Sequence, residues 1–356
     1  SILVLNCGSS SIKYQVIDME QTGSTLLAKG LVERIGLSDG VLTHKPVGRE
    51  NFELHRAIPD HTTGIRLVLD ALTDPAHGVV GSLDEIKAVG HRVAHGGEFF
   101  PQSCIVDEDV KRKIRSLFEI APLHNPANLE GVLSIEKVLP GTPQVTVFDT
   151  SFHQTIPAMN YLYALPHAYY EKYRVRKYGF HGTSHHYVAR KGAELVMGTR
   201  CGAIDASAIT FIGAKEGMSY AELDEMMNKR SGVQGMTDLS SDMRDIDKAY
   251  NEGNPHAIVA RDMYYNRVKK FVGAYAAEMG GVDLIVFTGG VGENSRELRR
   301  SVCAGLEFMG VEFDPAANEV RGEDKILSTP ASRVKVAVIA TDEELMIATD
   351  TYNLVK

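Results

Sequence analysis

The sequence has no segment that marks a membrane or secreted protein. Over 356 residues, no apolar run approaches the roughly 20 residues that a helix needs to span a bilayer. The first apolar stretch also lacks the basic segment and the cleavage site of a secretory signal. We therefore expect a globular protein with no membrane segment.

Cysteine is scarce and widely spaced. The sequence has only four cysteines, and no two of them have the C-x-x-C spacing of zinc sites and redox motifs: Cys7, Cys104, Cys201 and Cys303. This pattern fits reduced thiols better than a disulfide framework. It predicts a cytoplasmic location.

Positive charge is also in short supply. Lysine and arginine number 38 against 46 aspartates and glutamates, and the net charge is −8. This balance argues against a general nucleic-acid binder, and an anionic substrate must then be held by a few placed cations. The hydrophobic content of 44% is that of a globular protein. The length predicts about two domains.

Hydrophobic periodicity predicts an α/β protein. We expect strands at residues 2–5, 14–18, 26–33, 41–44, 86–89, 145–148, 284–287 and 334–339. We expect helices at 62–72, 107–118, 126–139, 255–279, 295–308 and 343–353. Antiparallel strands followed by alternating helices and strands indicate a mixed sheet with helices on its faces. The second half repeats the end of this pattern, which suggests a duplicated α/β unit.

Two glycine-rich turns could bind phosphate. The first turn contains Gly8, whose small size lets backbone N–H groups approach an anion, and Lys13 follows within reach of a phosphate. The second turn, at residues 288–294, follows a strand and opens a helix, whose N-terminus favours an anion. It matches neither the Rossmann nor the Walker A pattern. An ordinary hairpin turn and a plain strand-to-helix turn are the alternatives.

Charged residues at expected strand ends are candidates for binding a substrate. Arg92 could hold a carboxylate in a two-point grip, and Arg200, also flanked by glycines, could assist a doubly anionic transition state. Asp149 could bind Mg²⁺ or a proton. The alternatives are a surface arginine for Arg92 and a helix N-cap for Asp149.

The histidine-rich stretch at residues 181–186 has a spacing that resembles a zinc site. His181 and His185 stand four residues apart, but Gly182 occupies the place of the glutamate in H-E-x-x-H. We therefore prefer a histidine that donates to developing charge over a zinc ligand. By composition, the segments that begin near Asp242 and Glu343 predict only solvated helix starts.

Eight motifs together resemble the acetate kinase family. They occur in order over nearly the whole chain: NCGSSSIK, GHRVAHGG, APLHNPAN, VFDTSFHQT, YGFHGTSH, MGTRCG, GGVGEN and EELMIA. The family shares the fold of sugar kinases, Hsp70 and actin, which is two related α/β domains with mixed sheets around an ATP cleft. The resemblance implies a first domain of residues 1–149 plus 343–356 and a nucleotide-binding domain of residues 150–342.

The resemblance also implies a role for each matching residue. Mg²⁺, or Mn²⁺, would be held directly or through water by Asn6, Asp149 and Glu343. Catalysis would depend on Asp149, His181 and Arg200. The substrate carboxylate and its methyl group would contact Arg92, Ala94, Leu123 and Phe180. ATP would contact Ser9, Ser11, Lys13, Asp242, Met243, Arg244, Gly290, Val291, Gly292, Glu293 and Asn294.

The implied activity is reversible, Mg²⁺-dependent phosphoryl transfer from ATP to acetate, giving acetyl phosphate and ADP. Ala94 stands where acetate kinases commonly carry valine, so propionate is a further expected substrate and a propionate kinase is an alternative. A second alternative is an actin- or Hsp70-like ATPase, and a third is an inactive relative. The resemblance implies a homodimer, with no nucleic-acid or membrane partner.

The sequence departs from the family pattern near residues 190–192. The family carries a glycine-rich phosphate segment, His-x-Gly-Asn-Gly, between its Phe-His-Gly-Thr-Ser-His and Gly-Thr-Arg motifs, and residues 188–195 join these motifs directly. The pocket proline that the family draws from that segment is absent too. Either several dozen residues of the natural chain are missing from this sequence, or the protein lacks them and binds ATP poorly. We favour the first explanation because the flanking motifs are intact.

Overall fold

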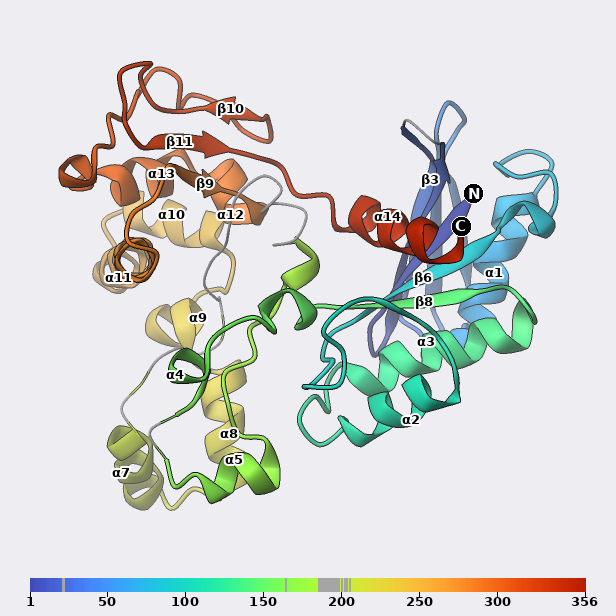
Figure 1. The fold of residues 1–356 in the computed structure, drawn as a ribbon, viewed down its shortest axis with the longest axis horizontal. Helices are drawn as coiled ribbons and strands as arrows, with labels where there is room; N and C mark the ends of the chain where they lie inside the picture. The colour runs from blue at the N-terminus through green and yellow to red at the C-terminus, as the bar shows by residue number, and fades with distance from the viewer. Residues whose placement is uncertain (21–22, 164, 185–198, 200, 202–203, 205) are drawn as a thin grey trace. The chain divides into compact units, whose positions relative to one another are not determined.

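The protein consists of two compact units. A computed structural model describes residues 1–20, 23–163, 165–184, 199, 201, 204 and 206–356. The first unit comprises Ser1–Tyr187 and Asp342–Lys356, and the second comprises Val188–Thr341 (Figure 1). The first unit therefore extends beyond residue 149, the end of the first domain that the resemblance implies. The physical reason is that the segment after Asp149 returns to it, with the Gly182 amide donating to the Asp149 carbonyl at 2.7 Å.

The first unit is built on one large mixed sheet. Its strands are β1 (Ile2–Cys7), β2 (Ser11–Met19), β3 (Ser24–Glu33), β4 (Gly40–Pro46), β5 (Phe52–Arg56), β6 (Ala88–Val93), β7 (Cys104–Ile105) and β8 (Gln144–Phe148). Its helices are α1 (His61–Thr73), α2 (Glu108–Ser116), α3 (Asn125–Val138), α4 (Ala158–Tyr161), α5 (Ala168–Tyr173) and α14 (Glu343–Val355), with 3₁₀ turns at Leu83–Glu85 and Ser151–His153.

The strand order brings three parallel strands together in this sheet. The order is β5-β4-β3-β2-β1-β6-β8-β7. Strands β1 to β5 pair antiparallel in sequence, whereas β1, β6 and β8 run parallel as neighbours. Helix α14 packs on β1, β6 and β8 and brings the C-terminus back beside the N-terminal strand (Figure 1).

Alternation of side chains along the strands gives the sheet two buried faces. Leu3 and Leu5 belong to the core shared with α1 and α3, while Ile2 and Val4 belong to the core under α14. Residues two apart on a strand share a face, so this division follows from the sequence of β1. Gly90 of β6 lies directly under α14, and a side chain there would collide with Thr351.

The second unit has a smaller sheet and more helix. Its described strands are β9 (Leu284–Phe287), β10 (Lys325–Ile326) and β11 (Lys335–Val338), in the order β10-β11-β9. Its described helices are α7 (Ala206–Glu216), α8 (Tyr220–Lys229), α9 (Gly232–Thr237), α10 (Met243–Asn251), α11 (Pro255–Glu278), α12 (Gly289–Asn294) and α13 (Arg296–Cys303), with a 3₁₀ turn at Glu307–Met309. Strands β9 and β11 are parallel, as a β-α-β unit requires.

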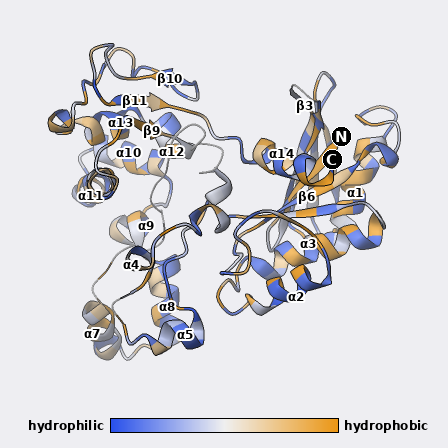
Figure 2. Cartoon of the chain, in the orientation of Figure 1, coloured by the Kyte–Doolittle hydropathy of each residue, from blue (hydrophilic) through white to orange (hydrophobic). Residues whose placement is uncertain are grey.

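The expected fold class is confirmed: two sheets, one of them large and mixed, are flanked by helices. Hydrophobic and hydrophilic residues both occur along helices such as α2, in keeping with one face toward the core (Figure 2). Asp107 caps α2 as predicted, accepting from the Val110 amide at 2.7 Å. Strand β5 was not predicted, and the expected helix at 295–308 ends at Cys303, close to Gly305, which adopts a left-handed φ of 88°. No helix in the described part of the chain is long and apolar enough to cross a membrane.

Candidate active site

The three parallel strands carry polar residues to one edge of the sheet. Asn6 lies at the end of β1, Arg92 at the end of β6, and Asp149 directly after β8, where its amide donates to the Val93 carbonyl at 3.0 Å. Strand alternation places these three side chains on the face that α14 covers. Glu343, the first residue of α14, reaches the same edge.

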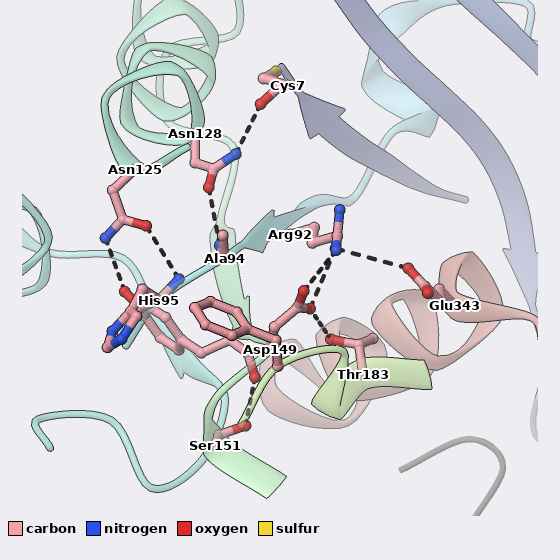
Figure 3. A network of polar contacts seen from close by, with 12 residues as sticks. Cys7, Arg92, Ala94, His95, Asn125, Asn128, Asp149, Ser151, Thr183 and Glu343 are labelled. Atoms are coloured by element: carbon pink, nitrogen blue, oxygen red, sulfur yellow. Dashed lines mark hydrogen bonds and ion pairs between the residues drawn. The ribbon is translucent and has the colours of Figure 1, made fainter. Parts of the chain in front are cut away.

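An ion pair between a buried carboxylate and a partly buried arginine forms the centre of this site. The Arg92 guanidinium donates to both oxygens of the Asp149 carboxylate, from Nη2 at 2.6 Å and from Nε at 3.2 Å (Figure 3). The Thr183 hydroxyl donates to Asp149 Oδ1 at 3.0 Å, and Glu343 Oε2 lies 3.7 Å from Arg92 Nε. Only 1% of Asp149 is exposed, so this carboxylate depends on Arg92 and Thr183 for its solvation. Among the described residues, neither simpler alternative fits: Arg92 pairs with Asp149 and is only partly exposed, and none of the hydrogen bonds of the Asp149 side chain caps a helix.

The electrostatics of the site depend on burial and on neighbouring charge. Burial disfavours the charged form of Arg92, but the Asp149 and Glu343 carboxylates outweigh this effect and raise the Arg92 pKa. The pKa of Glu343 is raised, chiefly because the side chain is buried and also because Asp149 and Glu344 lie nearby. The site therefore has an excess of negative charge around one arginine, and a bound cation would relieve it.

Two asparagines of α3 fix the strand ends, and the sequence pattern did not single them out. The Asn128 carboxamide accepts from the Ala94 amide at 2.9 Å and donates to the Cys7 carbonyl at 2.7 Å, which ties the ends of β6 and β1 together (Figure 3). Asn125 bonds both the amide and the carbonyl of His95, at 3.1 and 2.9 Å. These buried amides hold the backbone that carries Arg92. Their only sequence signal was membership of the APLHNPAN motif.

The segment that returns to Asp149 contains a strained turn at His181 and Gly182. His181 is exposed and has a φ of 55°, which is uncommon for a residue with a side chain and costs about 1 kcal/mol or more. Gly182 follows it, and a side chain there would collide with the Asp149 carbonyl. The turn thus holds His181 near the ion pair and leaves its imidazole accessible.

The residues expected around the substrate methyl group differ in burial. Ala94 is buried, and its amide donates a hydrogen bond to the Asn128 carboxamide, while Leu123 is 60% exposed. The Phe180 ring, partly exposed, makes an edge contact with His95 at a centroid distance of 5.4 Å. Phe180 thus contacts the residue that follows Ala94 in the chain, and no contact among the described residues places Leu123 beside either of them.

The first glycine-rich turn lies at the same edge. Lys13 is the pairing partner of Asn6 between β2 and β1, and its ammonium forms an ion pair with Glu344 of α14. Ser9 is exposed and Ser11 is half-buried in the turn, which the Gly8 amide closes by donating to the Ser11 carbonyl at 2.8 Å. Lys13 is 55% exposed and can turn from Glu344 toward a phosphate.

The second unit contains a cavity of about 1000 Å³. Most of the residues expected to bind ATP line it: Asp242, Met243, Arg244, Gly290, Val291, Gly292 and Asn294. Asp242 caps α10, and hydrogen bonds from Arg244 lower the Asp242 pKa to about 2. Glu293 does not line the cavity. Its carboxylate turns back and accepts from the amides of Gly289 at 2.8 Å and Thr341 at 3.0 Å.

The sequence matches one protein family over nearly its whole length. The model of the Acetokinase family matches residues 1–196 and 192–349. The chain belongs to the acetokinase family. Acetate kinase of Treponema denticola is 48% identical over all of both chains, and acetate kinase of Alkaliphilus metalliredigens is 47% identical over 99% of this chain and all of its own.

Solved structures of the acetokinase family have the same fold. Acetate kinase of Porphyromonas gingivalis superposes with a TM-score of 0.94, is 44% identical and covers 100% of this chain and 99% of its own. A propionate kinase of Francisella tularensis has a TM-score of 0.89, is 34% identical and covers 99% of both chains. The two α/β units therefore have the arrangement of helices and strands found in acetate and propionate kinases.

The match to the acetokinase family is interrupted where the sequence pattern predicted. It falls into two parts that meet at residues 192–196, and the alignment with the Treponema denticola relative spans 397 residues although this chain has 356. Relatives thus carry residues that this sequence lacks. Arg200 and His185, two of the candidate residues, lie outside the described residues.

The donor set at the sheet edge fits a hard cation. Asn6, Asp149 and Glu343 offer amide and carboxylate oxygens, which Mg²⁺ and Mn²⁺ prefer. Arg92 and Thr183 donate to Asp149 Oδ1, whereas Oδ2 accepts one hydrogen bond from the described residues, which leaves it a lone pair for a metal-bound water. Among the described residues, no three His, Cys, Asp or Glu side chains are grouped as a metal site.

Proposed function

We propose that this protein is an acetate kinase that reversibly transfers the γ-phosphoryl group of ATP to acetate. The support is its membership of the acetokinase family and the names of its full-length relatives. The observation that carries the proposal is the Arg92–Asp149 pair at the ends of the parallel strands, held beside Glu343. A partly buried arginine at a sheet edge suits a small carboxylate substrate.

In this proposal, Arg92 binds the acetate carboxylate, and Asp149 orients the Arg92 guanidinium. The guanidinium has five N–H donors, and the bonds to Asp149 use one from Nε and one from Nη2, so Nη1 remains for the substrate. Ala94 and Phe180, with Leu123, surround the methyl group. Asp149 thereby fixes the guanidinium plane before the substrate arrives, which reduces the entropy lost on binding.

The chemistry needs positioning and charge neutralisation more than acid–base catalysis. A carboxylate oxygen of acetate attacks the γ-phosphorus, the bond to the ADP oxygen breaks, and no proton has to move because acetate is already anionic. His181 and Arg200 stabilise the charge on the transferring phosphoryl group. Asp149 acts as an orienting residue for Arg92 and as a metal residue rather than as a general base.

We assign Mg²⁺, with Mn²⁺ as a substitute, to the oxygen atoms of Asn6, Asp149 and Glu343. When bound, the cation neutralises phosphate charge and favours the transfer. Activity should vanish when EDTA removes the metal and return with either ion. Recovery with Zn²⁺ alone would contradict this donor assignment, because a zinc site would prefer histidine or thiolate ligands.

We assign the cavity of the second unit to the nucleotide. Asp242, Met243 and Arg244 form the adenosine side, and the glycine segment of α12 forms the opposite wall. Ser9, Ser11 and Lys13 of the first unit act on the phosphates. Glu293 keeps a structural role in the glycine segment, since its carboxylate is engaged by backbone amides.

A coupled assay for ADP release tests the proposal. We expect ADP release to depend on acetate and to be accompanied by acetyl phosphate, which hydroxylamine traps. ADP release at the same rate without acetate would instead favour an actin- or Hsp70-like ATPase. An intact mass near 39.0 kDa for the native protein, together with absent ADP binding, would favour an inactive relative that lacks the missing segment.

Propionate kinase activity is the second candidate, and one residue favours it. Ala94 is buried at the expected methyl pocket, and its side chain is smaller than valine by two methyl groups. One solved relative is a propionate kinase. We therefore propose that the enzyme accepts propionate as well as acetate.

We also propose that the protein is a cytoplasmic homodimer. Light scattering in solution would test its oligomeric state.

A further inference from the structure

Arg299 of α13 is a buried cation that the proposed reaction does not use. Its side chain is wholly buried, and its guanidinium is surrounded by neutral acceptors. Nη1 donates to the carbonyls of Gly292 at 2.9 Å and Glu293 at 2.8 Å, and Nη2 donates to the carbonyls of Asn318 at 3.1 Å and Val320 at 2.7 Å. Nε donates to the Asn318 carboxamide at 2.8 Å. All five N–H groups are therefore satisfied.

These acceptors belong to two separate segments that flank the cavity of the second unit. Gly292 and Glu293 belong to α12, the glycine segment. Asn318 and Val320 belong to the loop that leads to Arg321, and both Gly292 and Arg321 line the cavity. Asn318 is itself wholly buried and donates to the Arg296 carbonyl at 3.0 Å, which connects the loop to the start of α13.

The charge of Arg299 has no compensating ion pair among the described residues. Burial lowers its pKa, and the nearby Arg296 and Arg321 act in the same direction. A buried cation of this kind is costly, and an apolar side chain of the same volume would avoid that cost. An apolar side chain would, however, remove the Arg299 hydrogen bonds to five acceptor oxygens, of which the Glu293 carbonyl would keep a long hydrogen bond from the Gly322 amide at 3.3 Å. The hydrogen bonds of Arg299 therefore point to a role in positioning the two segments rather than in raising the stability of the whole fold.

We propose that Arg299 is a positioning residue that sets the separation of the glycine segment and the 318–321 loop, and thereby the affinity of the cavity for nucleotide. This inference rests on the proposed assignment of the cavity to ATP and ADP. Arg299 touches no ligand in this scheme and acts through the carbonyls that it holds. Because all of its partners lie in the second unit, its loss should affect nucleotide binding and leave the acetate requirement at Arg92 unchanged.

The test compares Arg299→Lys with Arg300→Gln in the full-length protein. Lysine keeps the charge but offers three donors in place of the planar five-donor fork. Arg300 is the next residue on the same helix, half-exposed, and its side chain pairs with Glu297 at 3.4 Å, so its loss removes one arginine without touching the carbonyls. ADP binding by calorimetry is the first readout, and the KM values for ATP and acetate are the second.

We expect Arg299→Lys to weaken ADP binding by about tenfold or more, which corresponds to about 1.4 kcal/mol. The KM for ATP should rise in parallel, the KM for acetate should stay within about twofold, and Arg300→Gln should resemble the wild type. Should Arg299→Lys fail to fold, Asn318→Ala, which removes one of the five acceptors and keeps Arg299, should still raise the KM for ATP selectively.

Two outcomes would overturn the inference. One is a folded Arg299→Lys variant with wild-type affinity for ADP, or an Asn318→Ala variant with unchanged KM for ATP. The other is an equal loss for ATP and acetate that follows the loss of thermal stability, which would indicate a purely structural role. Failure of the wild-type protein to release ADP in response to acetate would instead refute the proposed function, and wild-type kinetics separate the two cases.

Discussion

Replacing Arg92 by alanine should damage stability as well as activity. Asp149 is almost completely buried, and in the wild type its carboxylate accepts two hydrogen bonds from Arg92 and one from Thr183. Alanine leaves this carboxylate with Thr183 alone among the described side chains. The variant therefore keeps a buried charge that has lost its partner.

The expected magnitude follows from the burial of the pair. Removing one partner of a buried ion pair costs about 3 to 5 kcal/mol because the remaining charge stays uncompensated. In a unit of this size, each kcal/mol lowers the melting temperature by about 2 to 4 °C, so the first unit should melt roughly 6 to 20 °C lower. Activity should fall as well, with kcat/KM lower by about 10² to 10³, the range for losing one electrostatic donor.

A double-mutant cycle with Asp149→Asn separates the charge from the packing. We expect Arg92→Ala with Asp149→Asn to be more stable than Arg92→Ala alone, because the amide carries no buried charge. Thermal unfolding by circular dichroism measures the three variants and the wild type at one pH. Arg92→Lys is the matched control: it keeps a cation beside Asp149 and should recover most of the stability but little of the activity, since it lacks the planar fork.

Equal melting temperatures for Arg92→Ala and the wild type would refute this reasoning. So would a cycle in which the effects of the two substitutions simply add, because additivity means that the two side chains do not interact in the folded protein. If Arg92→Ala is less stable but has wild-type kinetics, the ion pair is supported, whereas Arg92 does not bind the acetate carboxylate.

Three further predictions concern neighbouring residues. Ala94→Val should lower kcat/KM for propionate more than for acetate, whereas the wild type should use propionate within about tenfold of acetate. If the wild type rejects propionate more than a hundredfold and Ala94→Val changes nothing, Ala94 does not set the size of the pocket. His91 is buried with its pKa lowered to about 4, so the unfolded state binds the proton more tightly, and stability should fall as the pH drops from about 6.5 to 4. His91→Gln should flatten that part of the unfolding curve measured against pH, and an unchanged curve would contradict the assignment. Gly90→Ala should destabilise the protein by about 1 to 3 kcal/mol in urea unfolding through its collision with Thr351, and Thr351→Ala in the same chain should recover part of the loss; no coupling between the two would show that α14 moves aside freely.

The fold was predictable where the sequence carries strong periodicity. The strand at the N-terminus, the helix capped by Asp107 and the long helix from Pro255 all appear within a few residues of their expected positions. Strand β5 was not predicted because only three of its residues, Phe52, Glu53 and Leu54, alternate before charged side chains follow. Its stability comes from pairing with β4, which local sequence does not reveal.

The sequence indicated candidate site residues but not the contacts among them. Arg92 and Asp149 both followed expected strands, and open α/β sheets gather ligands at such ends. Their pairing depends on β6 and β8 being neighbours in the sheet, although 57 positions separate the two residues in the chain. The roles of Asn125 and Asn128 were beyond sequence reasoning for the same reason, since an asparagine near the start of a helix is ordinarily read as a local cap.

The two adjacent arginines of α13 show most clearly what periodicity leaves undecided. Arg299 and Arg300 are the same residue type on one amphipathic helix, yet the first is wholly buried and the second is half-exposed. Leu298 and Val302 mark the buried face, and Arg299 lies between them at a position where a helix of this kind accepts either an apolar or a long polar side chain. The burial of Arg299 depends on the carbonyls of α12 and of residues 318–320, which accept its hydrogen bonds. These segments come together only in the folded unit. Arg299, buried against carbonyls rather than against a carboxylate, therefore holds together two segments that contribute to the lining of the cavity. The structure shows these hydrogen bonds directly, whereas the sequence shows two adjacent arginines and does not distinguish between them.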